Sequence, residues 1–95
     1  MREFKALLWE ADGTRRQWTV RFCRIPPEEN GDRNWGTCDW DKRLICIESC
    51  LRKRDSILDT MMHEGAHAAA GVNGSEWLIE AIEDNHQTLR KAFDA

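Results

Sequence analysis

The sequence predicts an α+β fold, with a small antiparallel sheet of three to four strands followed by two helices. Two observations support this prediction. Apolar residues alternate with polar ones in the first half of the chain, which is the period of a half-buried strand. Beyond Cys50 they recur with the period of about 3.6 residues that is typical of a helix. The 95 residues, 41% hydrophobic and 33% charged, fit one compact globular domain over 1–95.

The first half of the chain is expected to form two hairpins. Their four strands are expected at residues 4–9, 17–25, 36–40 and 44–48. Asp12 and Gly13 suit the turn of the first hairpin, because an Asp-Gly pair tolerates the positive φ angles of tight turns. Pro26 ends the second strand, and a polar loop follows it. The turn of the second hairpin is expected at Asp41 and Lys42.

The second half of the chain is expected to form two helices. Asp55 or Ser56 can cap the start of the first helix, and Gly71 offers a left-handed stop at its end. Ser75 is a suitable N-cap for the second helix. One face of this second helix carries an apolar stripe made of Leu78, Ile82, Leu89 and Phe93.

The first predicted helix contains a complete H-E-x-x-H motif between His63 and His67. Residues four positions apart lie about 5 to 6 Å from each other on one helical face, so both imidazoles can reach one ion. Histidine suits Zn²⁺, because a neutral ring nitrogen binds this ion at about 2.0 to 2.1 Å. Glu64 follows the first histidine and is expected to act as the general base that activates water. The alternative is a pair of solvated or core histidines.

A catalytic zinc ion normally has three protein ligands, so one more ligand is expected. Glu76 is the first choice, because residues 71–74 can turn the chain back and bring the next helix against the His67 end of the motif. The dipole of that helix also favours a carboxylate in its first turn, which gives Glu76 a structural explanation too. Glu80 is the second choice, and His86 or no protein ligand remains as a further alternative.

Other polar residues near the motif have two interpretations. Asp59, one turn before His63, could hydrogen-bond to the ring of that ligand or serve in helix capping. His86 and Arg90 could stabilise an oxyanion or simply lie at the surface. The four cysteines are expected to stay reduced rather than form a second zinc site, and they are Cys23, Cys38, Cys46 and Cys50.

Charge and hydropathy exclude other classes of protein. The net charge of −3 gives no strong electrostatic case for nucleic acid, although the short basic run of Arg52, Lys53 and Arg54 leaves a nucleic-acid partner as a third alternative. No apolar stretch approaches the roughly 20 residues that span a bilayer. The first residues lack the hydrophobic region of a signal peptide, so we expect a cytoplasmic protein. The expected partner is a peptide or protein substrate.

These residues resemble the zincin metallopeptidases, and more narrowly the minimal gluzincin-like proteins of phages and bacteria. The similarity runs from Trp35 to about Phe93, and the motif and the Ser75-Glu76 pair are its clearest parts. Its implied site residues are the zinc ligands His63, His67 and Glu76 and the base Glu64. The resemblance also implies that an edge strand beside the cleft binds an extended peptide, with residues 44–48 as the candidate strand.

The chain departs from this family in the middle of its motif. Gly65 stands where bulkier apolar residues are usual, and it costs about 1 kcal/mol relative to alanine inside a helix. Close packing against a neighbouring segment would explain the glycine. The chain also lacks tyrosine, so no phenol can assist the transition state. A zinc-stabilised protein-binding module without turnover is therefore the competing prediction to a zinc-dependent peptidase.

Overall fold

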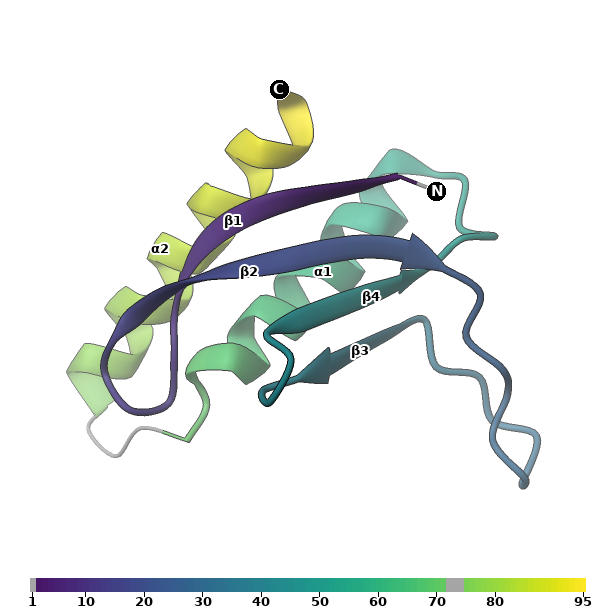
Figure 1. Ribbon diagram of the computed structural model, residues 1–95, viewed down its shortest axis with the longest axis horizontal. Helices are drawn as coiled ribbons and strands as arrows, with labels where there is room; N and C mark the ends of the chain where they lie inside the picture. The colour runs from purple at the N-terminus through teal and green to yellow at the C-terminus, as the bar shows by residue number, and fades with distance from the viewer. Residues whose placement is uncertain (1, 72–74) are drawn as a thin grey trace.

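Four strands are followed by two helices in the computed structural model, which describes residues 2–71 and 75–95. The elements are β1 (Glu3–Trp9), β2 (Arg15–Cys23), β3 (Gly36–Asp39), β4 (Leu44–Glu48), α1 (Arg54–Ala69) and α2 (Ser75–Asp94). Both helices lie on the same face of the sheet (Figure 1). The structure therefore confirms the predicted α+β fold, and each predicted strand appears within two residues of its expected ends.

The strand order is β1-β2-β4-β3, and one of its three pairings is parallel. β1 pairs with β2 and β3 pairs with β4 in antiparallel hairpins, as expected. β4, however, runs parallel to β2, with Val20 opposite Ile45. The loop after β2 crosses to the edge of the sheet opposite β1, where the chain forms β3. The chain then turns back, and β4 lies between β2 and β3 (Figure 1). The sheet is consequently mixed rather than entirely antiparallel.

The same strand order corrects the expectation that residues 44–48 form the edge strand. β4 is paired on both sides, because β2 and β3 flank it. Its Ile45 and Ile47 are fully buried, as an inner strand requires. The edge strand next to α1 is β3, the shortest strand of the sheet.

One hydrophobic core fills the space between the sheet and the two helices. Trp18 is fully buried in this core, and its indole Nε1 donates a 2.7 Å hydrogen bond to Glu10 Oε2. The same carboxylate accepts a 2.6 Å bond from Arg43 Nε, which ties the first hairpin to the second. The remaining large members of the core include Leu8, Val20, Ile45, Ile47, Leu58, Met61, Leu89 and Phe93. Neither helix within residues 2–71 and 75–95 has the length and apolar character needed to cross a membrane.

The helix ends differ from the expected caps. α1 begins one residue before Asp55, with Lys53 at its N-cap position and no side-chain cap, so Asp55 lies in the first turn instead. Positive φ angles among the described residues occur at two glycines and one arginine, and Gly71 is not one of them. Gly71 instead allows close approach, because a Cβ there would lie 2.7 Å from Ala11 Cβ. The N-cap expected at Ser75 depends on its own side chain and on residues 72–74, which lie outside the described part of the chain.

Candidate functional site

Helix α1 brings the two motif histidines together on its exposed surface. His63 Nε2 and His67 Nε2 lie 3.0 Å apart, and the ring planes are nearly perpendicular, at 87°. Both side chains are exposed, so neither contributes to the hydrophobic core. The structure thus supports the part of the interpretation that required both rings to turn toward one point.

The histidine pair fits the first two ligands of a zinc site. Two nitrogens bound to one tetrahedral zinc ion at the usual bond length lie about 3.3 Å apart. The observed 3.0 Å between the two Nε2 atoms is a hydrogen-bond distance that is also close to that spacing, so a bound ion would replace the contact between the rings. Neutral imidazole is also a favoured zinc ligand. His63 and His67 are therefore the residues that would hold the metal.

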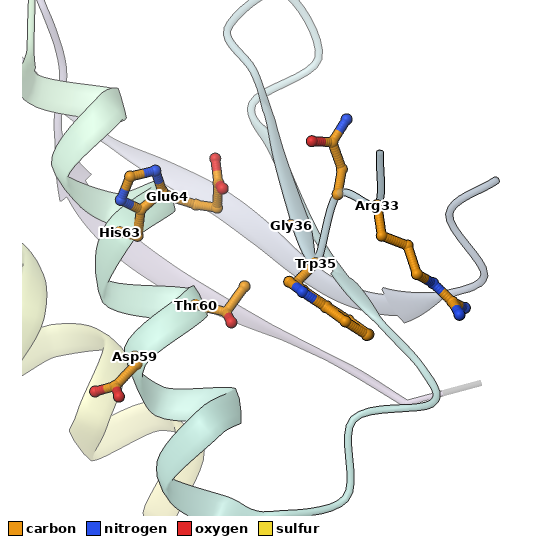
Figure 2. Close-up of a pocket in the computed structure, with 8 residues that line it drawn as sticks. Arg33, Trp35, Gly36, Asp59, Thr60, His63 and Glu64 are labelled. Carbon is orange, nitrogen blue, oxygen red and sulfur yellow. The ribbon is translucent and has the colours of Figure 1, made fainter. Parts of the chain in front are cut away.

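Glu64 lies on the side of α1 that faces β3, and it is largely buried, with 7% of its surface exposed. Figure 2 shows its side chain extending from α1 toward the strand. A Cβ added to Gly36 would lie 3.1 Å from Glu64 Oε2, so the strand passes close to the carboxylate. Burial raises the pKa of Glu64 above its ordinary value, while His67 and His63 act in the opposite direction. A carboxylate in such a position is suited to accept a proton.

An open cleft of about 360 Å³ lies between α1 and the start of β3. Its helical wall includes Asp59, Thr60, His63 and Glu64, and its other wall is formed by residues 33–36 (Figure 2). The motif therefore opens onto a hollow rather than onto a flat surface. Most residues that line this cleft are polar or charged, and Trp35 is its one large apolar side chain.

The candidates for a third ligand lie outside this cluster. Glu76 and Glu80 are exposed on the first turns of α2, and no group of three potential metal-binding side chains forms in the described part of the chain. His86 is half-buried, and its Nε2 lies 3.0 Å from the carbonyl oxygen of Met62, which occupies that ring nitrogen. Glu76 therefore stays a prediction, whereas the contact of His86 assigns that ring to the packing of α2 on α1.

The two remaining candidates from the sequence, Asp59 and Arg90, make no side-chain hydrogen bond to the histidine pair within the described residues. Asp59 lies on the wall of the cleft, and in Figure 2 its carboxylate points away from His63. Within residues 2–71 and 75–95 it makes no hydrogen bond to the imidazole. Arg90 is exposed on α2, and it does not belong to the residues that line the cleft. The role of these residues in catalysis gains no support from the geometry.

Five cleft residues were missed by reasoning from the sequence, and they are Arg33, Asn34, Trp35, Gly36 and Thr60. The guanidinium carbon of Arg33 lies 5.1 Å from the ring centre of Trp35, which is a cation–π contact. Trp35 and Gly36 follow a polar loop directly, and a large aromatic residue beside a glycine at a strand start was the available signal. It could not identify the partner, because α1 meets this strand only in the tertiary structure.

Gly65 and Asn85 fix the motif helix from its opposite side. A Cβ at Gly65 would lie 2.6 Å from Leu89 Cδ1, so the expectation of close packing at this glycine is confirmed. Asn85 is fully buried, and its Nδ2 donates 3.1 Å hydrogen bonds to the carbonyl oxygens of Gly65 and Trp9. Its Oδ1 accepts a 2.7 Å bond from the Trp9 amide. α1 is thereby held to both α2 and β1 at the level of the motif.

The site thus consists of an exposed histidine pair, a buried carboxylate and a cleft beside the edge strand. Its charged and aromatic groups come from two segments that lie far apart in the sequence, residues 33–36 and α1. In comparisons with models of protein families, with curated proteins and with solved structures, no match to this chain was found.

Proposed function

We propose that this chain is a zinc-dependent, metallopeptidase-like hydrolase that cleaves peptide bonds. His63 and His67 are the proposed metal ligands, and Glu64 is the proposed general base. The observation that carries the proposal is the convergence of the two Nε2 atoms, 3.0 Å apart, beside a cleft that also contains the Glu64 carboxylate. This arrangement corresponds to the zincin resemblance of the motif.

The chemistry divides between the metal and the protein. When bound, zinc lowers the pKa of water to about 7 and polarises a carbonyl group. Glu64 accepts a proton from water at its carboxylate and delivers it to the leaving amine. The narrow space between α1 and β3 orients that carboxylate, because Gly36 approaches it so closely. The outer edge of β3 offers backbone groups to an extended substrate.

The third ligand is proposed to be Glu76, with Glu80 as the alternative. Both carboxylates belong to the N-terminal turns of α2 and are exposed, so each is available to an ion. Zinc affinity measured by competition with a chelator distinguishes them. We expect Glu76→Ala to weaken zinc binding at least about tenfold and Glu80→Ala to change it less. The reverse result would exchange their roles.

A direct test compares metal content and hydrolysis in a small set of variants. The wild-type protein should bind one zinc ion and cleave denatured casein, and His63→Ala should lose the metal. Glu64→Gln should keep the zinc and lose hydrolysis about 100-fold or more, because general base catalysis typically contributes that much. Glu83→Gln, an exposed glutamate on α2, is the matched control and should behave as wild type.

Three results would count against the proposal in different ways. Wild-type protein without stoichiometric zinc would contradict the proposed metal site. Hydrolysis by Glu64→Gln at the wild-type rate would contradict the proposed role of Glu64 as the general base. Unfolding on treatment with a chelator would favour the zinc-stabilised binding module. We expect the fold to survive the chelator, since both histidines are exposed and lie outside the core.

A further inference from the structure

The charges of the cleft are divided between its two walls. The helical wall contributes the carboxylates of Asp59 and Glu64, whereas the wall formed by residues 33–36 contributes Arg33. Figure 2 shows the Arg33 side chain across the cleft from α1 and directed away from the helix. Apart from the candidate ligand His63, Arg33 is the only side chain among the described lining residues that can carry a positive charge. The cleft therefore has a cationic outer end.

Arg33 is held in place by three neighbouring side chains. Its guanidinium carbon makes the cation–π contact with Trp35, and its Nη2 donates a 3.7 Å hydrogen bond to Cys50 Sγ. The same nitrogen lies 3.7 Å from Glu48 Oε1. Only 1% of the Glu48 side chain is exposed, so this contact anchors the guanidinium to the interior of the fold. A side chain fixed in this way loses little conformational freedom when it binds a ligand.

The other N–H groups of Arg33 are available to a ligand. No hydrogen bond within residues 2–71 and 75–95 uses its Nε or Nη1, and 45% of its side chain is exposed. A guanidinium is a planar donor whose fork matches the two oxygens of a carboxylate. Hydrogen bonds of this kind, in which both partners are charged, are stronger than neutral ones. A carboxylate is consequently the ligand that this side chain fits best.

The charge of Glu48 does not cancel the positive charge of this region. The Glu48 carboxylate accepts hydrogen bonds from the backbone amides of Ile25 and Cys50, at 3.1 and 3.3 Å, so backbone dipoles already stabilise it. Arg24 lines a small hollow of about 190 Å³ together with Arg33 and Glu48. Two positive charges thus stand against one negative charge, and the surplus lies at the outer end of the cleft.

The opposite charges of the two walls give a substrate one preferred direction. A carboxylate near the helical wall would be repelled by Asp59 and Glu64, whereas it gains hydrogen bonds at Arg33. Figure 2 shows Trp35 between Arg33 and the helix, so a group bound to Arg33 lies away from the motif. The acidic group is therefore expected at a fixed distance from the bond that is cleaved rather than next to it.

We propose that Arg33 is a specificity-determining residue that binds a carboxylate of the substrate. The substrate class is accordingly a polypeptide that carries an acidic side chain, or its own C-terminal carboxylate, on one side of the cleaved bond. The cleavage rests on the proposed function, whereas the binding of the carboxylate depends on Arg33. Arg33 is not placed at the reacting atoms, so its removal should change the choice of substrate and leave the chemical step intact.

Matched pairs of peptides test this preference. The probes are short neutral peptides, acetylated and amidated at their ends, in which a single glutamate or glutamine occupies each position in turn. At one position relative to the cut, wild-type protein should cleave the glutamate peptide with a kcat/KM about tenfold above that of its glutamine twin. Arg33→Gln should abolish this ratio and cleave the glutamine peptide within about twofold of wild type.

Two further variants and a second set of peptides sharpen the result. Arg33→Lys keeps the charge and should keep part of the preference, also if Arg33→Gln perturbs the fold. Arg52→Gln removes an exposed arginine outside the cleft lining and should keep the preference in full. Peptides with a free C-terminus distinguish the two sources of the carboxylate. A gain of about tenfold from the free C-terminus, whatever the position of the glutamate, would assign the C-terminal carboxylate.

Binding to Glu64→Gln protein separates this inference from the proposed reaction. Fluorescence anisotropy of the same peptides, labelled with fluorescein, should show the glutamate preference without cleavage. Equal rates for glutamate and glutamine at every position, with amidated and free C-termini alike, would overturn the inference. So would an equal loss of both peptides in Arg33→Gln, because a purely structural role predicts that result. Arg33-dependent binding without hydrolysis by wild-type protein would sink the proposed peptidase and keep the carboxylate site, and hydrolysis without any preference would do the opposite.

Discussion

Helix α1 has two sides with opposite properties. Toward α2, Gly65 meets Leu89 so closely that a Cβ would lie 2.6 Å from its Cδ1, and Asn85 is completely buried there. Toward β3, the same helix borders an open cleft, with Glu64 at its inner wall. The five-residue motif therefore serves two purposes. One residue fixes the helix, and its neighbours carry the candidate chemistry.

A glycine marks each of these two contacts. Gly65 belongs to α1 and allows α2 to approach, whereas Gly36 belongs to β3 and allows the strand to approach α1. A Cβ at Gly36 would lie 2.7 Å from Thr60 Cγ2 and 3.0 Å from Glu64 Cγ. Adding side-chain atoms at these two positions should therefore separate packing from activity.

The largest effect is expected from Gly36→Ala, on the open side. The new methyl group must displace Thr60, Glu64 or the strand itself, and a misplacement of about 1 Å can cost 100-fold in rate. We expect kcat/KM for casein hydrolysis to fall about 100-fold. Stability should also fall, by about 1 kcal/mol or more, because Gly36 is half-buried and the methyl group overlaps its neighbours, so activity is compared per folded molecule. Steady-state kinetics and urea unfolding measure the two quantities.

Thr60→Ser provides the control for this variant. It removes the Cγ2 atom that the alanine would meet and keeps the hydroxyl, which donates a 2.9 Å hydrogen bond to the Ser56 carbonyl oxygen. The double variant Gly36→Ala/Thr60→Ser should regain part of the lost activity. If Gly36→Ala alone cleaves as fast as wild type, the close approach of β3 has no role in positioning Glu64.

A smaller effect, on stability, is expected from Gly65→Val on the packed side. The valine would overlap Leu89 in a fully buried contact, and overpacking of this kind typically costs about 2 kcal/mol. Activity per folded molecule should stay within about twofold of wild type, since the cleft lies on the other side of the helix. Urea unfolding monitored by circular dichroism gives the change in stability.

The partner residue supplies the check. Leu89→Ala removes the atom that the valine would meet, so the double variant should be more stable than the sum of the two single changes predicts, by about 1 kcal/mol or more. Strict additivity would mean that the two residues do not collide. A loss of activity in Gly65→Val equal to that in Gly36→Ala would mean that the two sides of α1 are not separate.

The sequence predicted where the strands and helices lie better than it predicted which strands pair with one another. The apolar run of residues 44–47 located the strand at residues 44–48 and indicated that it is well buried, but such a run carries no information about which strands lie beside it. Its place between β2 and β3, parallel to β2, depends on the path of the long loop after Pro26. The expected edge strand was wrong for this reason.

The same limit applies to the candidate site. His63, Glu64 and His67 were predictable, since helical spacing alone places two histidines on one face. Gly65 was recognised as unusual, but Leu89 could not be named as its partner. Trp35 lies far from the motif in sequence, and it reaches the cleft because β3 occupies the edge beside α1.

The smallest expected effect concerns two thiols that differ in their surroundings. Burial raises the pKa of Cys38 to about 12, and the Glu64 carboxylate adds to this rise, whereas Cys50 is exposed at the end of the sheet. The thiolate is the reactive form, so Cys38 should be alkylated far more slowly than Cys50 by iodoacetamide at about pH 8. Mass spectrometry of peptides gives both rates. The rate at Cys38 should increase steadily as the pH rises toward 12.

Glu64→Gln turns this measurement into a probe of the cleft. Removing the carboxylate charge should lower the pKa of Cys38, and alkylation at a fixed pH should accelerate by about two- to threefold, because burial is the larger cause and stays in place. Cys50 serves as the internal control, and its rate should not change. If the rate at Cys38 is also unchanged, the Glu64 carboxylate does not face the inner side of β3, and the geometry of the cleft must be different in solution.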